Sequence, residues 1–147
     1  MKIKSFTLLL LILLITGCTS TIKTTKESTI GSITEKYWKL KSIEGKEVVF
    51  KENQEREIFI TLRMNDKTVT GFAGCNTLSG QYTLEGNNRI SFKNIAVTMK
   101  ICPNVGNDES KLLKVLELAK NYSLTNDVLT LSSDKKVSLA VFEAVYM

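Results

Sequence analysis

Short segments of this chain alternate apolar and polar side chains with a period of two residues. The alternation is clearest where Ile58, Ile60 and Leu62 alternate with Phe59 and Thr61. This period places successive side chains on opposite faces of a β-strand, so that one face of each segment is buried. Further strands are predicted from Tyr37, with Trp38, Leu40 and Ser42 on one face, and at 68–72, 81–84, 89–92, 128–131 and 137–142, the last with Val137, Leu139 and Val141 on one face.

Turn residues separate these segments at intervals that suit hairpins. Asn and Gly tolerate the positive φ angles of tight turns, and Ser and Asp form local hydrogen bonds there. Neighbouring strands are therefore expected to run antiparallel. The predicted turns are Asn65-Asp66, Glu85-Gly86-Asn87-Asn88 and Ser132-Ser133-Asp134.

One segment, between Asn107 and Asn121, has a helical period instead. Leu112, Leu116 and Ala119 fall on one face, with Leu113 widening the stripe. A helix of about twelve residues is predicted, with Asn107 or Asp108 as its cap, Glu109 in the positive first turn and Lys120 in the last. Such a helix either lies on a membrane surface or packs on a sheet, and its mixed charges favour packing.

These elements predict an α+β fold in a single domain, since 147 residues are too few for two ordinary ones. The expected architecture is a small, mostly antiparallel, barrel-like sheet with one amphipathic helix packed on it or plugging it. Closing the sheet leaves few exposed strand edges.

The N-terminus has the features of an export signal. A basic start is followed by an apolar stretch from Phe6 to Ile15, which is too short to span a bilayer as a permanent anchor. Ile15-Thr16-Gly17-Cys18 resembles a bacterial lipobox, in which the cysteine is lipidated and becomes the first residue of the mature chain. The alternatives are an ordinary signal with a chance cysteine and an uncleaved membrane helix.

The predicted organisation is a lipoprotein signal peptide over 1–17, a lipidated N-terminus and flexible tether over 18–35, and a folded domain over 36–147. The tether is rich in Thr, Ser and Lys and has little apolar mass to bury. Membrane attachment through a lipid at Cys18 would place the protein in the cell envelope. Thr19 stands where an Asp would resemble an inner-membrane retention signal, so a two-membrane host would hold the protein on its outer membrane, facing the periplasm.

The absence of histidine excludes the Ser/His/Asp triad and the common His/Cys zinc sites. No metal, cofactor or catalytic residue is predicted. The net charge is +5, or +3 once the predicted signal peptide with Lys2 and Lys4 is removed, and a charge of this size supports solubility but is too small to indicate nucleic-acid binding. Export also argues against a nucleic-acid partner. Lys111, Lys114 and Lys120 form either an anionic-lipid contact or, as acidic neighbours favour, a solvated face.

The centre of the chain carries the most specific motif. Gly71-Phe72-Ala73-Gly74-Cys75-Asn76 is followed by Gly80-Gln81-Tyr82 and, further on, by Thr98-Met99-Lys100-Ile101-Cys102, while Trp38-Lys39-Leu40 stands near the start of the domain. This combination resembles the META domain family, in the group of HslJ-like heat-shock and envelope lipoproteins. The match runs from about Tyr37 to Phe142.

The resemblance implies a small barrel-like sheet with a helix, similar to a lipid-binding secretin pilot lipoprotein. It also implies a role in heat-shock or envelope-stress tolerance without an established catalytic activity. One departure is visible, because family members often have a basic residue, Met and Ala before the second cysteine. Here Met99 and Lys100 stand in reversed order, and Ile101 replaces the small residue.

The motif residues also have a physical interpretation. Gly71 and Gly74 indicate a bend that needs positive φ or a close approach of the backbone. The Asn76 amide is expected to satisfy backbone groups within that bend. Cys75 is a poor candidate for a nucleophile or redox thiol, since no histidine base or Cys-x-x-Cys pair accompanies it. In an exported protein Cys75 and Cys102 are expected to form a disulfide, the alternative being two buried thiols.

The aromatic side chains admit two interpretations, as core residues or as the lining of a ligand pocket, and their strand spacing favours the core. They are Trp38, Phe59, Phe72, Tyr82, Phe92 and Phe142.

The leading functional hypothesis is a non-catalytic, membrane-anchored protein that binds an envelope protein or an apolar ligand. The alternative is an enzyme or inhibitor acting on envelope peptide or glycan through Asp108, Glu109 or Glu143. Carboxylates at a helix start are more often caps and dipole partners.

Overall fold

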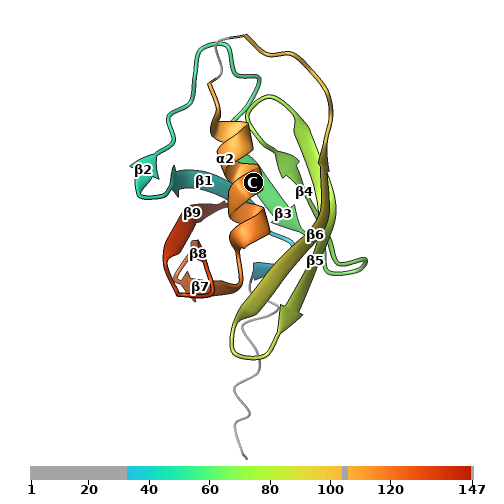
Figure 1. Ribbon diagram of the computed structural model, residues 1–147, viewed down its shortest axis with the longest axis vertical. Helices are drawn as coiled ribbons and strands as arrows, with labels where there is room; N and C mark the ends of the chain where they lie inside the picture. The colour runs from blue at the N-terminus through green and yellow to red at the C-terminus, as the bar shows by residue number, and fades with distance from the viewer. Residues whose placement is uncertain (1–32, 104–105, 147) are drawn as a thin grey trace, which may run out of the picture.

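The computed structural model describes residues 33–103 and 106–146. The predicted signal peptide, Cys18 and the tether up to residue 32 lie outside the described residues. The described part is an α+β domain in which a mostly antiparallel sheet closes into a barrel-like ring beside one helix (Figure 1), as the sequence predicts. The strands are β1 (Tyr37–Ile43), β2 (Lys46–Glu47), β3 (Phe59–Leu62), β4 (Thr68–Phe72), β5 (Thr77–Glu85), β6 (Arg89–Val97), β7 (Asn121–Thr125), β8 (Val128–Ser132) and β9 (Ser138–Val145), and the helix is α2 (Asp108–Leu118).

The ring closes where β1 pairs with both β3 and β9, and all pairings are antiparallel. It is weakest between β6 and β7, which share only the pair Arg89 and Asn121. Helix α2 lies over this opening and buries Leu112, Val115 and Leu116 against the sheet. Covering an open stretch of sheet with a helix protects both the strand edge and the core. Within the described residues, no helix combines the length and apolarity that crossing a membrane requires.

The interior of the barrel is filled by side chains. Trp38, Tyr82 and Phe142 are its largest fully buried members, and the inward positions of β3, β4 and β8 supply aliphatic ones. The Trp38 indole N–H donates to the Ile33 carbonyl at 2.8 Å, and the Tyr82 hydroxyl donates to the Arg63 carbonyl at 3.0 Å. Both polar atoms are therefore satisfied, as buried groups must be.

The folded part begins earlier than the predicted boundary at residue 36. Ile33 is completely buried and Thr34 nearly so, although both were assigned to the tether. The reason is tertiary, because the Trp38 indole holds the Ile33 carbonyl and the Glu35 N–H donates to Leu62 at 2.9 Å. Neither contact can be predicted from the amino-acid composition of the segment.

The helix is shorter at its C-terminal end than the pattern predicts. Ala119 already has extended backbone angles, and the Lys120 N–H donates to Ser132 in the sheet at 2.9 Å. Lys120 is thus not in the last helical turn, which has no basic residue. The Asn107 cap position makes no side-chain capping bond. The chain passes directly into β7, a strand that the sequence did not predict.

The predicted face of the last strand is only partly right, since Leu139 is buried but its two predicted partners are not. Ala140 and Phe142 face the core, whereas Val137 lies before β9 and is 59% exposed. The pairing with β8 shifts between Leu131 and Ser132, so β9 has one extra residue at that point. A bulge of this kind reverses the alternation of faces along the strand.

Candidate functional site

The two glycines of the central motif shape the bend between β4 and β5. Gly71 pairs with Ile60, and a Cβ there would overlap the Phe59 carbonyl oxygen. Gly74 has a φ of +112°, a conformation that side chains disfavour. The Ala73 N–H donates to the Asn76 carbonyl at 2.8 Å and closes the bend. The glycines therefore provide the close approach and the positive φ that the motif predicted.

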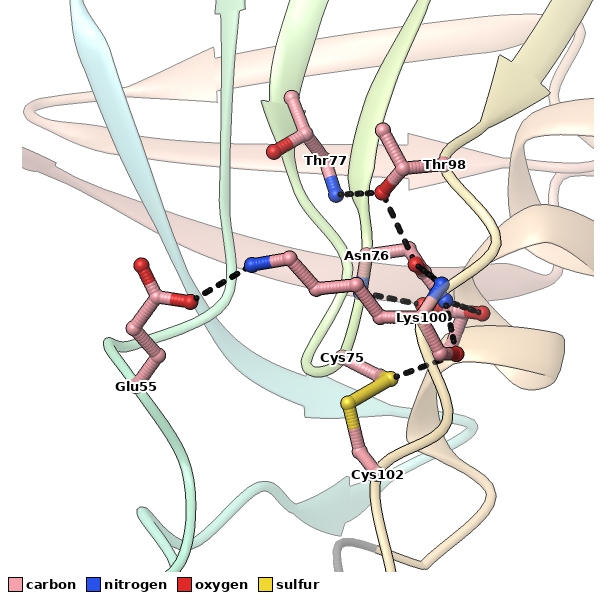
Figure 2. Close-up of a disulfide and its surroundings, with 8 residues drawn as sticks. Glu55, Cys75, Asn76, Thr77, Thr98, Lys100 and Cys102 are labelled. Carbon is pink, nitrogen blue, oxygen red and sulfur yellow. Dashed lines mark hydrogen bonds and ion pairs between the residues drawn. A yellow bond between two sulfur atoms is a disulfide. The ribbon is translucent and has the colours of Figure 1, made fainter.

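Asn76 is the centre of the polar network beside this bend (Figure 2). Its Oδ1 accepts hydrogen bonds from the Lys100 N–H at 2.7 Å and the Thr98 hydroxyl at 2.8 Å. Its Nδ2 donates to the Glu109 carboxylate at 3.0 Å. The prediction that this amide serves groups within its own bend is corrected, because it holds the 98–100 segment and the helix instead. Asn76 is buried, and these three hydrogen bonds are partly buried.

Glu109 connects helix α2 to the same bend. Besides the Asn76 amide, its carboxylate accepts the Asn76 backbone N–H at 2.7 Å. The sequence predicted a dipole partner for the first helical turn or, in the alternative hypothesis, a catalytic carboxylate. The position in that turn is correct, but the partner lies 33 residues away in the chain, and no local pattern indicates it.

Cys75 and Cys102 form a disulfide with their Cα atoms 5.8 Å apart. The bond fixes the segment after β6 to the bend, next to the Asn76 network (Figure 2). In this state neither sulfur is a thiol, so the arrangement offers no support for a nucleophilic Cys75. The cysteine pair and Asn76 together hold the backbone of residues 98–102 in place.

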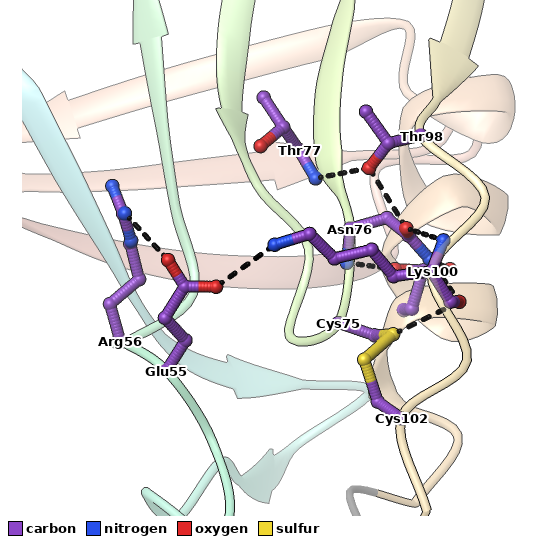
Figure 3. A network of polar contacts seen from close by, with 9 residues as sticks. Glu55, Arg56, Cys75, Asn76, Thr77, Thr98, Lys100 and Cys102 are labelled. Carbon is purple, nitrogen blue, oxygen red and sulfur yellow. Dashed lines mark hydrogen bonds and ion pairs between the residues drawn. A yellow bond between two sulfur atoms is a disulfide. The ribbon is translucent and has the colours of Figure 1, made fainter.

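A groove of about 450 Å³ opens beside the disulfide. It is lined by Asn53, Glu55, Phe72, Gly74, Cys75, Lys100, Ile101, Cys102 and Pro103. The Lys100 ammonium donates to Glu55 at 3.2 Å across it, and Arg56 donates to the same carboxylate at 2.9 Å (Figure 3). These two hydrogen bonds, of which the one from Arg56 has the larger effect, hold the pKa of the Glu55 carboxyl below its usual range.

Large apolar side chains stand out from the segments around this groove. Met99 and Ile101 are 97% and 96% exposed, and Val49 and Phe50 are 66% and 57% exposed. An ion pair between Lys51 and Asp108 ties the segment after β2 to the start of α2. We call residues 48–58 and 98–103 the loop end, because both segments lie at the same end of the molecule, at the top of Figure 1.

The carboxylates of the alternative hypothesis have other partners. Asp108 pairs with Lys51 and Lys111, and Glu143 on β9 pairs with Lys41 on β1 at 3.2 Å. Glu109 faces Asn76, so the structure does not bring two of these carboxylates together. Across the two described ranges, no three Cys, Asp or Glu side chains are grouped to hold a metal ion.

The remaining residues singled out from the sequence take part in packing, hydrogen bonds or ion pairs within the domain. A Cβ at Gly80 would collide with Ile95 of β6, at a shift in the β5–β6 pairing. The Thr98 hydroxyl accepts the Thr77 N–H at 3.2 Å. On the helix, Lys111 and Lys114 pair with Asp108 and Glu117. Three of the predicted aromatic residues are in the core: Trp38, Tyr82 and Phe142. Phe72 is buried beneath Arg56 on the outer face, and Phe92 is half-buried. Phe59 stacks on Tyr37 outside the barrel.

Comparison with known proteins gives a family and a fold. The model of the META domain matches residues 31–146. A protein from Burkholderia xenovorans, solved by NMR, is 22% identical and has a TM-score of 0.65, with 81% of this chain and 88% of that chain covered. A second NMR structure is 23% identical, with a TM-score of 0.60 and coverages of 79% and 95%. No curated protein matches.

The two solved structures show the same fold at identities that carry no functional information. The family match spans the barrel, the disulfide, the Asn76 network and the helix. The chain therefore belongs to the META domain family.

Proposed function

We propose that this protein is a lipid-anchored, non-catalytic envelope protein whose META domain binds a partner protein through the loop end. The observation that carries the proposal is the exposure of Met99 and Ile101 on a segment whose backbone is fixed by a disulfide and by Asn76. Exposed apolar area costs about 25 cal/mol per Å² relative to burial, and clustered exposure of this kind is typical of interaction sites.

A partner protein suits the site better than a small apolar ligand enclosed in the barrel. The barrel interior is occupied by core side chains such as Trp38 and Phe142. The large apolar side chains of the loop end are exposed, and one of them, Ile101, lines a groove with room for one or two side chains of a partner. Pre-ordered apolar residues around a small groove are what binding hot spots require, because little conformational entropy is lost on binding.

The anchor completes the proposal. Lipidation at Cys18, after removal of 1–17, would hold the domain at the membrane, in the periplasm of a two-membrane host. The described chain starts in the lower half of Figure 1, whereas the loop end lies at the top. An anchored domain of this shape can present the loop end to a partner. A role in envelope-stress tolerance is part of the proposal and rests on the family resemblance.

Site-specific photo-crosslinking in the native host tests the proposal. A photoreactive residue at Ile101 is expected to give one defined adduct with a partner protein, and the Met99→Ser substitution is expected to weaken it. The matched position is Val137, which is also an exposed apolar residue but lies outside the loop end. Equal adducts from both positions, or none from Ile101, would contradict the proposal. The intact mass of the membrane fraction tests the anchor separately, since acylated Cys18 as the first residue is expected.

A further inference from the structure

We propose that the outer face of β1, β3 and β4 is a binding site for an acidic saccharide. This face adjoins the loop end, which contributes Arg56, but it does not include Met99 or Ile101. A groove of about 420 Å³ runs over this face. Among its lining residues are the rings of Tyr37 and Phe59, the hydroxyls of Thr61 and Thr70, and two guanidinium groups. Aromatic rings, hydroxyls and guanidinium groups can together recognise a sugar ring that bears a carboxylate.

Strand alternation places the residues of the groove on the outside. Trp38, Ile60 and Val69 point into the core, so their neighbours Tyr37, Phe59, Thr61 and Thr70 point outward. The rings of Tyr37 and Phe59 are stacked, with centroids 4.1 Å apart and planes 17° apart. The pair is half-buried, which leaves a rigid aromatic surface for the C–H face of a sugar.

The hydroxyls lie beside this aromatic pair. Thr61 and Thr70 are directly opposite each other on β3 and β4. Neither hydroxyl has a hydrogen-bond partner among the residues that the structure describes. Each can donate one hydrogen bond and accept others, so both are available to sugar hydroxyls.

The charged groups favour an anion. Arg56, Arg63 and Lys36 line the groove together with the carboxylate of Glu35, and the Glu57 carboxylate lies beside Tyr37. Arg63 pairs with Glu35 at 3.3 Å and Arg56 with Glu55 at 2.9 Å, and all four side chains are about half exposed. Exposed pairs of this kind contribute little stability, and a guanidinium has five donors, so both can bind a ligand carboxylate.

The same face does not suit an extended peptide. Strand β3 is paired with β1 and β4, and β4 is paired with β3 and β5, so neither strand has a free edge to which a peptide strand could add. Recognition must therefore use side chains. Stacked rings with arginines also suit single-stranded nucleic acid, and that ligand is one outcome of the test.

The test uses the full-length protein in detergent and calorimetric titration with three probes. These are an oligogalacturonic acid, its fully methyl-esterified form with the same rings but no charge, and an oligothymidylate. The acid is expected to bind at least about tenfold more tightly than the ester, and its binding is expected to weaken with salt. No binding of the acid, equal binding of acid and ester, or tighter binding of the oligothymidylate would overturn the proposal.

Variants assign the site. Arg63→Gln and the nearly isosteric Thr61→Val with Thr70→Val are each expected to weaken binding of the acid by about tenfold. Arg89→Gln is the matched control, because Arg89 is an exposed arginine paired with Asp134 and lies outside the groove. Binding that Arg89→Gln weakens as much as Arg63→Gln would overturn the assignment. Since Arg63 is exposed, its variant is expected to fold, which circular dichroism checks. Met99→Ser is expected to leave this binding unchanged, so failure here is distinguishable from failure at the loop end.

Discussion

Asn76 and Glu109 lie 33 residues apart in the chain, yet the Glu109 carboxylate accepts hydrogen bonds from both the backbone N–H and the side-chain amide of Asn76. Hydrogen bonds to charged groups contribute more than neutral ones, and an unpaired buried donor is costly. This one pair fixes the start of the helix to the bend that carries the disulfide. It gives Glu109 a structural role beyond the helix dipole.

Glu109→Ala is expected to lower the free energy of unfolding by about 2 to 3 kcal/mol, because two donors of Asn76 lose a charged acceptor. A role in the helix dipole alone predicts about 1 kcal/mol at most. Urea denaturation measures the difference. Glu117→Ala is the control, since Glu117 is exposed and, among the described residues, pairs with Lys114 of the same helix. A loss for Glu109→Ala no larger than that of the control would contradict the assignment.

Tyr37 provides a pH-dependent prediction. Burial, and then the neighbouring Glu57 carboxylate, raises the pKa of Tyr37 to about 12. In the unfolded chain the tyrosine ionises near pH 10, so between these values the folded state binds more protons than the unfolded state. The contribution of protonated Tyr37 to stability is complete below pH 10 and is lost as the pH rises to about 12.

Tyr37→Phe is therefore expected to remove one tyrosine that titrates near pH 12 and to reduce the loss of stability between pH 10 and 12. The difference in ultraviolet absorbance between the two proteins isolates this group from the other tyrosines. A difference titration centred near pH 10 would show that the folded environment of Tyr37 has no such effect.

At the scale of elements, the β3–β4 pairing depends on the absence of a side chain at Gly71. A Cβ there would overlap the Phe59 carbonyl and lie 3.0 Å from the Ile60 Cα, and backbone atoms cannot move away as a side chain can. Gly71→Ala is expected to cost at least about 3 kcal/mol of unfolding free energy, as overpacking does in a tight site. Gly86→Ala, in the open turn between β5 and β6, is expected to stay within about 1 kcal/mol. Equal thermal stability of the two variants would contradict this account.

The disulfide joins two other elements, the β4–β5 bend and the segment that leads to the helix. It closes a separation of 27 residues, for which the chain-entropy model gives about 3.5 kcal/mol. The double variant Cys75→Ala with Cys102→Ala is expected to fold, because Asn76 still holds residues 98–100. Its free energy of unfolding, measured by urea denaturation, is expected to be lower by about that amount. A loss below about 1 kcal/mol would show that the Asn76 network alone fixes the segment.

The elements that the sequence predicts best are those whose signal is local. Strand β3 and the N-terminal start of α2 follow from periodicity, and the positive φ angles of Asn87 and Asn88 follow from the residues of the turn. Strand β7 was missed because Tyr122 is its one buried side chain and a helix precedes it directly. Of the predicted face of β9 only Leu139 is buried, because a bulge reverses the alternation of faces along the strand.

The whole molecule depends on contacts that no local pattern contains. The barrel closes through β1 and β9, at opposite ends of the domain sequence, and Ile33 joins the core through the Trp38 indole. The Gly-Cys-Asn motif predicted a bend, but the connection of that bend to Glu109 depends on the position of the helix over the gap between β6 and β7. The sequence shows that residues 99 and 101 are apolar, but it does not show that Met99 and Ile101 are exposed on a segment that tertiary contacts hold in place.

An affinity measurement tests whether the fixed segment 98–102 binds a partner protein. The affinity of the full-length protein for the partner identified by crosslinking is compared between Met99→Ser with Ile101→Ser and the control Val137→Ser. The loop-end variant is expected to bind at least about tenfold more weakly, because two exposed apolar contacts are lost, and the control is expected to bind as the unmodified protein does. Equal affinities for the two variants would show that the loop end does not form the binding surface.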